Sequence, residues 1–231
     1  MADGNIIDAA PLKIVQELLP VVSAQKTRLV ENIFSLTKRV LDVTGALVLI
    51  AFLLPLFLTM ATLIRLDGGS WLYAQKRLGE GGRHFTLWKL RSMVPDAERM
   101  LAEHIASDAG ARTEWAANQK LTRDPRVTSI GRILRKYSLD ELPQLFNVLC
   151  GDMSLVGPRP MMVDQESLYP GLVYAGLRPG LTGLWQISKR DDATFAARAR
   201  FDAAYAANMS LGEDFRIAFL TLGYFVRGRG Q

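Results

Sequence analysis

The feature that most constrains this chain is an uncharged apolar segment from Val43 to Ile64, which contains no Asp, Glu, Lys, Arg or His. A helix rises about 1.5 Å per residue, and the hydrocarbon core of a bilayer is about 30 Å thick. A straight helix over this segment is therefore just long enough to cross a membrane. The segment predicts a membrane helix.

Pro55 lies in the middle of this segment and leaves two arrangements open. Proline has no backbone N–H, so the carbonyl of Ala51 loses its helical partner and the helix bends. Basic residues flank the segment on both sides, at Lys38, Arg39 and Arg65, and the positive-inside rule places both flanks in the cytoplasm. A re-entrant helix that enters and leaves by one face satisfies both observations. A kinked helix that spans the membrane is the alternative.

Composition narrows the classes of partner. Apolar residues make up 49 % of the chain and the mean hydropathy is +0.10, which predicts some apolar surface facing lipid. The formal net charge of +5 suits anionic partners such as phosphorylated substrates or acidic lipid. Nucleic acid is not predicted, because the sequence has no zinc-ligand spacing, heptad zipper or ribonucleoprotein motif.

Outside the apolar segment, the patterns predict a small α+β domain that is mostly helical. A minor β-hairpin is expected, with strands at residues 71–74 and 84–88 around a glycine-rich turn. Helices are expected at residues 96–119, 140–150, 193–208 and 211–226, and residues 132–137 are expected to form the end of a short helix. Residues 12–36, with a break at Pro20, and residues 96–119 are amphipathic enough to rest on a membrane surface, with packing on a core as the alternative.

Two adjacent carboxylates, Asp140 and Glu141, are the strongest candidates for chemistry. They are expected to open a helix just after Arg135 and Lys136, and both the helix dipole and these cations favour an ionised carboxylate. We therefore predict that Asp140 stays deprotonated and nucleophilic. Hard cations prefer carboxylate and phosphate oxygens, so a divalent cation could bring a nucleotide diphosphate to the pair. The structural alternative is a helix capping box formed by Ser138 and Glu141.

Scattered cations are candidates for binding phosphate, since arginine makes two-pronged contacts to phosphate and lysine acts as a point charge. Arg159 is well placed, because Pro158 and Pro160 hold its backbone in a fixed, non-helical conformation. For each cation a solvated surface role is the alternative. The candidates are Lys89, Arg91, Arg135, Arg159, Arg178 and Arg190.

Several stretches together resemble the monotopic phosphoglycosyl transferases, the bacterial sugar transferases that begin exopolysaccharide assembly. The landmarks are K-R-V-L-D at 38–42, K-L-R-S-M at 89–93, T-R-D-P-R-V-T at 122–128, S-L-D-E-L-P-Q at 138–144, G-D-M-S-L-V-G-P-R-P at 151–160, R-P-G-L-T-G at 178–183 and G-R-G at 228–230. Their order along the chain makes the resemblance specific.

The resemblance implies an organisation in three parts at the cytoplasmic face of the bacterial inner membrane. An interfacial segment is expected at residues 1–37 and a re-entrant membrane helix, broken at Pro55, at residues 38–66. A cytoplasmic catalytic domain is expected at residues 67–231. The serine that often precedes the proline in the family is replaced by Leu54 here.

The resemblance also implies a reaction in which a hexose 1-phosphate, of galactose or glucose, moves from a UDP-sugar to polyprenyl (undecaprenyl) phosphate and UMP is released. Asp140 and Glu141 would form the catalytic dyad, with Mg²⁺ bound at the site. The family places phosphate-binding cations at the positions of Lys89, Arg135, Arg159 and Arg190.

Arg190 matches the family pattern least well of these positions, because Lys189 and Asp191 flank it where the family usually has glycine and asparagine.

Two other functions stay open from the sequence: a membrane-associated glycosyltransferase that releases UDP, and a non-catalytic membrane scaffold in which the acidic pair only caps a helix. The choice between a monomer and a homo-oligomer is also open.

Overall fold

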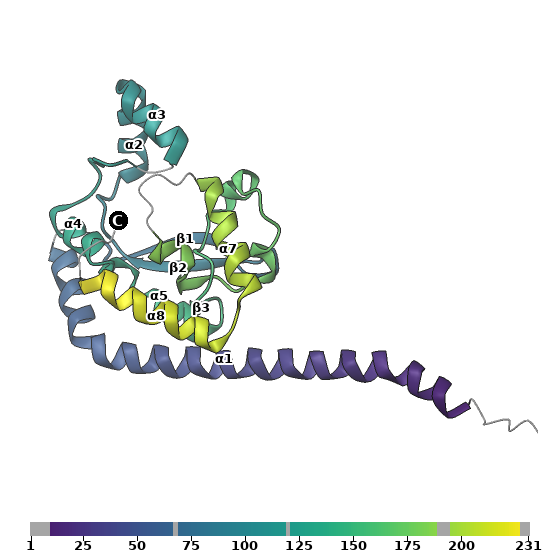
Figure 1. The fold of residues 1–231 in the computed structure, drawn as a ribbon. Coiled ribbons are helices and arrows are strands. Elements are labelled where there is room, and N and C mark those ends of the chain that lie inside the picture. Colours follow the sequence, from purple (N-terminus) through teal and green to yellow (C-terminus); the bar gives the residue numbers. More distant parts are fainter. Residues whose placement is uncertain (1–9, 67–68, 119–120, 189–194, 227–231) are drawn as a thin grey trace, which may run out of the picture. The chain divides into compact units, whose positions relative to one another are not determined.

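The computed structural model describes the backbone of residues 10–66, 69–118, 121–188 and 195–226. The chain divides between Leu41 and Asp42 into two compact units, and each is described by itself. The first unit contributes the N-terminal part of helix α1 (Ala10–Leu66), and the second contains the remaining elements (Figure 1). The predicted boundaries after residues 37 and 66 stay predictions.

Helix α1 carries the apolar segment and is continuous over 57 residues, so the predicted break at Pro20 is wrong. Its stretch from Asn32 to Leu66 is long and apolar enough to cross a membrane, with a hydropathy of 2.7 and only 6 % of the most apolar window buried. Pro55 does not end the helix. Within the second unit, the blue C-terminal part of α1 changes direction (Figure 1), and Thr59 Oγ1 donates a hydrogen bond to the Pro55 carbonyl, 2.8 Å away.

The predicted hairpin is confirmed. Strands β1 (Leu72–Leu78) and β2 (His84–Leu90) pair antiparallel, and the short helix η1 (Glu80–Gly82) forms the turn between them. Arg77 pairs with Phe85, and Tyr73 pairs with Lys89. Because opposite residues lie on the same face of a sheet and faces alternate along a strand, Arg77 and Lys89 share a face.

Helices make up most of the second unit, as predicted, although several of their boundaries differ from those expected. The helix expected over residues 96–119 is two helices, because Asp108 has an extended backbone and its carboxylate accepts a hydrogen bond from the Ala111 N–H, 3.0 Å away. Contact of these helices with a membrane stays a prediction. The α-helices after α1 are α2 (Ala97–Ser107), α3 (Ala109–Asn118), α4 (Ser129–Lys136), α5 (Gln144–Cys150), α6 (Leu184–Ile187), α7 (Arg198–Ala207) and α8 (Leu211–Val226).

The helix expected from Asp140 begins later than predicted. Residues 139–141 form a single 3₁₀ turn, η2 (Leu139–Glu141), and Pro143 precedes the first residue of α5. Gly151 ends α5 with φ of 90°, the left-handed conformation that glycine adopts without strain, as predicted. The remaining 3₁₀ helices are η3 (Val163–Leu168), η4 (Tyr174–Gly176) and η5 (Phe195–Ala197).

A second, parallel strand pair was not predicted. Strand β3 (Ser154–Val156) pairs with β4 (Gly180–Thr182), and the backbone of Gly157 lies against that of Gly180. A Cβ atom on Gly180 would overlap the Gly157 backbone nitrogen, so this crossing needs glycine. This close contact joins residues 151–160 to residues 178–183, two of the stretches that carry the family resemblance, and it lies next to Arg159 in the chain.

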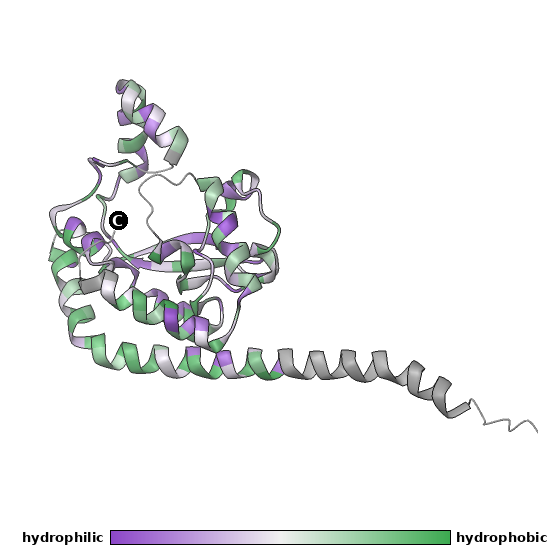
Figure 2. Ribbon diagram, viewed as in Figure 1, coloured by the Kyte–Doolittle hydropathy of each residue, from purple (hydrophilic) through white to green (hydrophobic). Residues whose placement is uncertain are grey.

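One hydrophobic cluster joins helix α1 to the hairpin and α5. Its buried members are Ala46, Phe85, Leu87, Leu145, Val148 and Met153. The buried carboxylate of Asp42, also on α1, accepts hydrogen bonds from Ser154 Oγ at 3.0 Å and from the Leu155 N–H at 2.8 Å. Residues 42–66 of α1 and much of α8 are hydrophobic (Figure 2), although many of their side chains are exposed. Such exposed apolar surface is typical of contact with lipid or protein.

Candidate active site

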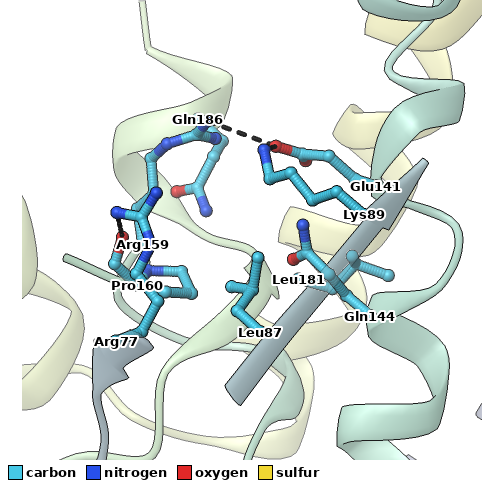
Figure 3. Close-up of a pocket in the computed structure, with 9 residues that line it drawn as sticks. All are labelled: Arg77, Leu87, Lys89, Glu141, Gln144, Arg159, Pro160, Leu181 and Gln186. Carbon is cyan, nitrogen blue, oxygen red and sulfur yellow. Dashed lines mark hydrogen bonds and ion pairs between the residues drawn. The ribbon is translucent and has the colours of Figure 1, made fainter. Parts of the chain in front are cut away.

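A polar pocket lies where the hairpin, the turn η2 with α5, and the segments after β3 and β4 meet. Charged groups dominate it: three cations and one carboxylate line its walls. Its lining residues are Arg77, Leu87, Lys89, Glu141, Gln144, Arg159, Pro160, Leu181 and Gln186 (Figure 3).

Glu141 joins two of the predicted phosphate-binding cations. Its Oε1 atom lies 3.1 Å from Lys89 Nζ and 3.2 Å from Arg159 Nη2. The Glu141 side chain is 17 % exposed, so these ion pairs are only partly screened by water. The structure therefore brings together three residues that are far apart in the sequence, from β2, η2 and the Pro158–Pro160 segment.

Asp140 lies beside this group and is mostly buried. Its side chain is 10 % exposed, and its Oδ2 atom lies 3.7 Å from Lys89 Nζ. Burial raises the pKa of the Asp140 carboxyl, and Lys89 opposes that rise. Glu141 raises the pKa further, whereas Arg135 and Arg159 lower it. The net direction is upward because the cost of removing the charge from water exceeds the effect of the nearby cations. That Asp140 is ionised and nucleophilic stays a prediction.

The backbone before the acidic pair excludes the capping box that the sequence left open. Ser138 is in the left-handed conformation, with φ of 50°, and its side chain makes no cap hydrogen bond. It is the one residue other than glycine with positive φ in the described part of the chain. Glu141 instead directs its side chain to Lys89 and Arg159. Such strained residues are frequent at functional sites.

Two predicted cations, Arg91 and Arg135, do not line the pocket. Arg91 Nη2 donates a hydrogen bond to the Ile64 carbonyl, 3.2 Å away, in the last turn of α1. Arg135 Nε donates to Ser92 Oγ, 3.0 Å away, although its charge still lowers the pKa of Asp140.

A further predicted cation, Arg178, does not line the pocket. Arg178 Nη2 forms an ion pair with Glu80 Oε2 at 3.1 Å, on the hairpin turn. Arg190 lies outside the described residues.

Three further residues line the pocket and were not predicted as site residues: Arg77, Gln144 and Gln186. The hairpin could have indicated Arg77. In the observed register Arg77 pairs with Phe85, which lies on the same face of β2 as Lys89. Gln144 closes the S-L-D-E-L-P-Q landmark. No pattern in the sequence indicates Gln186.

Asn147 attaches the strand that carries Lys89 to helix α5. It is 0 % exposed. Its Oδ1 atom accepts from the Trp88 N–H at 3.1 Å, and its Nδ2 donates to the Thr86 carbonyl at 2.7 Å. A single buried amide thus satisfies two backbone groups on one edge of β2, on either side of Leu87, and attaches the strand that carries Lys89 to α5.

Asp140 and Glu141 fit a Mg²⁺ site that is completed by substrate. Among the described residues, no group of three or more His, Cys, Asp or Glu side chains is gathered as a metal cage. Mg²⁺, however, is usually bound through one or two carboxylates together with substrate phosphates and water. The two adjacent carboxylates match that donor set, and metal binding stays a proposal.

The family model described as bacterial sugar transferase matches residues 33–228. The chain is 44 % identical over 210 residues to the exopolysaccharide production protein ExoY of Sinorhizobium fredii, covering 90 % of this chain and 93 % of that protein. It is 43 % identical over 195 residues to the undecaprenyl-phosphate galactose phosphotransferase of Salmonella typhimurium, covering 84 % of this chain and 41 % of that protein. It is 45 % identical over 195 residues to the UDP-galactose-lipid carrier transferase of Erwinia amylovora, with the same coverage.

Proposed function

We propose that this protein moves a hexose 1-phosphate from a UDP-sugar to polyprenyl (undecaprenyl) phosphate and releases UMP. The proposal starts from the family, because the chain belongs to the bacterial sugar transferases. The names of its relatives support this reaction, since one is an undecaprenyl-phosphate galactose phosphotransferase and another an exopolysaccharide production protein. Galactose and glucose are the sugars we propose. The product would begin the membrane stage of exopolysaccharide synthesis.

The observation that carries the proposal is the position of Asp140 beside a cationic pocket. Lys89 lies within 3.7 Å of Asp140 and 3.1 Å of Glu141, and Arg159 lies 3.2 Å from Glu141. A pocket with three cations in its walls suits a sugar diphosphate, whose charge must be neutralised as the phosphoryl group is transferred.

In the proposed first step, an oxygen of the Asp140 carboxylate attacks the phosphorus that bears the sugar. The bond from this phosphorus to the bridging oxygen breaks, and UMP leaves with the electron pair. An oxygen of polyprenyl phosphate then attacks the same phosphorus and displaces the carboxylate, giving polyprenyl diphosphate sugar. The two steps separate a soluble donor from a lipid acceptor, so the two anions never need to meet in one complex.

Side chains around Asp140 favour the first step through their charge. Lys89 opposes the effect of burial on Asp140 and favours its ionised, nucleophilic form. Arg159 and Lys89 offer positive charge to the phosphoryl oxygens. Asp140 and Glu141 would hold Mg²⁺, which supplies further charge neutralisation on the diphosphate when it is bound.

The apolar part of α1 supports a site at the membrane surface. We propose that residues 38–66 form a re-entrant helix that turns at Pro55, with both flanks on the cytoplasmic face of the inner membrane. The basic residues on both sides of the segment and the change of direction in α1 support this arrangement (Figure 1). It would keep the pocket near the headgroups, where the lipid phosphate lies.

The decisive experiment uses purified enzyme in detergent with a panel of UDP-hexoses and no lipid acceptor. We expect about one UMP per active site and a sugar phosphate mass on the peptide that contains Asp140. Asp140→Asn should lower UMP release at least about 1,000-fold, as removal of a nucleophile usually does. Asp164→Asn is the matched control, since Asp164 is an exposed carboxylate on η3.

Other outcomes would point to other functions. Release of UDP in place of UMP would indicate a glycosyltransferase. Substantial activity in Asp140→Asn would show that the nucleophile is another group. A protein that turns over none of the UDP-hexoses, with or without lipid acceptor, would favour the scaffold.

A further inference from the structure

We infer that Arg77 binds a phosphoryl group other than the one that is attacked, in the part of the pocket beyond Arg159. The inference rests on the proposed function for the identity of the substrate. The anion-binding property of Arg77 itself rests on the geometry of the pocket and can be measured without turnover.

Arg77 is placed for this role by the hairpin. It lies on β1, on the face that also presents Leu87 and Lys89 to the pocket. In Figure 3 its side chain rises from the floor of the pocket toward Arg159, on the side away from Glu141 and Lys89. The pocket therefore has one cationic end beside the acidic pair and a second cationic position farther from it.

The contacts of Arg77 differ from those of the other two pocket cations. Lys89 and Arg159 both form ion pairs with Glu141. Arg77 hydrogen bonds only to neutral oxygens in the described part of the chain: Nη2 donates to Gln75 Oε1 at 2.6 Å, and Nη1 donates to the Pro160 carbonyl at 3.4 Å. Its Nε atom is buried and has no hydrogen-bond partner among the described residues.

This arrangement is unfavourable for a guanidinium unless an anion completes it. Burial, followed by the nearby charge of Arg159, lowers the pKa of Arg77 to about 10. A buried charge normally has a partner of opposite sign, whereas the neighbouring charge with the largest effect on Arg77 is that of another cation, Arg159. A phosphoryl group would supply both the negative charge and acceptor oxygens for the planar, two-pronged guanidinium.

The charge of the pocket agrees with two phosphoryl positions. One carboxylate, Glu141, faces three cations, so a sugar diphosphate adds the missing negative charge. Lys89 is nearest to Asp140, where the attacked phosphorus must lie. The second phosphoryl group belongs either to the departing nucleoside monophosphate or to the polyprenyl phosphate that follows it. Both are phosphate monoesters with the same chemistry for an arginine.

The first experiment measures binding by titration calorimetry on the full-length protein in detergent, with UMP and with inorganic pyrophosphate as probes. Arg77→Gln should weaken the binding of one or both about 10-fold or more, because a hydrogen bond to a charged group is lost. Lys76→Gln is the matched control: Lys76 is the next cation on β1, is exposed, and lies on the opposite face of the strand. It should leave both affinities within about twofold.

The second experiment separates the two sources of phosphate. If Arg77 holds the departing nucleotide, Arg77→Gln slows the UMP burst without lipid acceptor and leaves the later discharge by polyprenyl phosphate unchanged. If Arg77 holds the lipid phosphate, the burst is normal and the discharge is slow. Either result supports the inference and names the ligand. Arg77→Lys should recover part of the lost rate, because it keeps the charge but not the two-pronged contact.

The inference is overturned if Arg77→Gln and Arg77→Lys bind both probes as tightly as Lys76→Gln does and show normal rates in both half-reactions. It is also overturned if both Arg77 variants melt at a lower temperature and their weaker binding is explained by the fraction of unfolded protein, because Arg77 would then only support the fold. Failure of the proposed function looks different: the unmodified enzyme would release no UMP from any UDP-hexose, while pyrophosphate binding would still report on Arg77.

Discussion

Asn147→Ala tests whether a single buried amide holds the lysine strand against the acidic turn. The change removes two hydrogen bonds to β2, to the Trp88 N–H at 3.1 Å and to the Thr86 carbonyl at 2.7 Å, and a longer one to Asp152 Oδ2 at 3.4 Å, at a position that is 0 % exposed. Each backbone group left buried without a partner costs about 1–3 kcal/mol. Taking about 1.5 kcal/mol for each gives a loss of about 3 kcal/mol. For a protein of this size, that lowers the melting temperature by about 6–12 °C.

The assay is thermal unfolding of the detergent-solubilised protein, followed by tryptophan fluorescence, with UMP release measured at a temperature where each variant is folded. Asn208→Ala is the control, because Asn208 is exposed and bonds only within its own helix end. It should change stability by no more than about 0.5 kcal/mol. Asn147→Asp should also destabilise, since its second oxygen would face the Thr86 carbonyl. A melting temperature for Asn147→Ala equal to that of Asn208→Ala would falsify this account of how Lys89 is positioned.

Three further predictions concern the strand crossing, the membrane helix and the metal. Gly180→Ala should cost about 1–3 kcal/mol of stability in thermal unfolding, because its Cβ would overlap Gly157, whereas Gly212→Ala, where a Cβ meets no atom within 4 Å, should not destabilise. Asp42→Ala should lower the melting temperature by leaving the Leu155 N–H unpaired, at a cost of about 1–3 kcal/mol, and Asp42→Asn should lose less because it keeps an acceptor oxygen. Removal of divalent cations with EDTA should stop UMP release and added Mg²⁺ should restore it; UMP release that persists in EDTA would contradict a metal role for the acidic pair.

Several elements could be predicted from the sequence because their causes are local. The absence of charge from Val43 to Ile64 indicated a membrane helix, and the glycine-rich turn indicated the hairpin. Helix α8 has the bounds that its apolar face predicted, and Gly151 ends α5 as expected. Periodicity, turn chemistry and hydropathy act over a few residues, so one sequence is enough to show them.

The pairing of the site residues could not be predicted in this way. The sequence left open whether Glu141 takes part in a helix cap, and only the folded structure shows that its side chain contacts Lys89 and Arg159. Arg91 was an equally good candidate by residue type, yet it bonds to the last turn of α1. Which cation reaches which carboxylate depends on how strands, helices and turns pack, and that information is spread over the whole chain.

The sequence by itself determined the chemical groups available: a carboxylate pair, a set of cations and an apolar helix. Tertiary structure decided how exposed each group is to water. Asp140 shows the difference, because its neighbours in sequence favour a low pKa whereas its burial in the folded protein raises that pKa. Arg77 shows it again, since only the fold places its guanidinium in the pocket, where its hydrogen bonds within the described chain go to the neutral oxygens of Gln75 and Pro160. Desolvation and long-range charge depend on distances in space, and neither can be read from order along the chain.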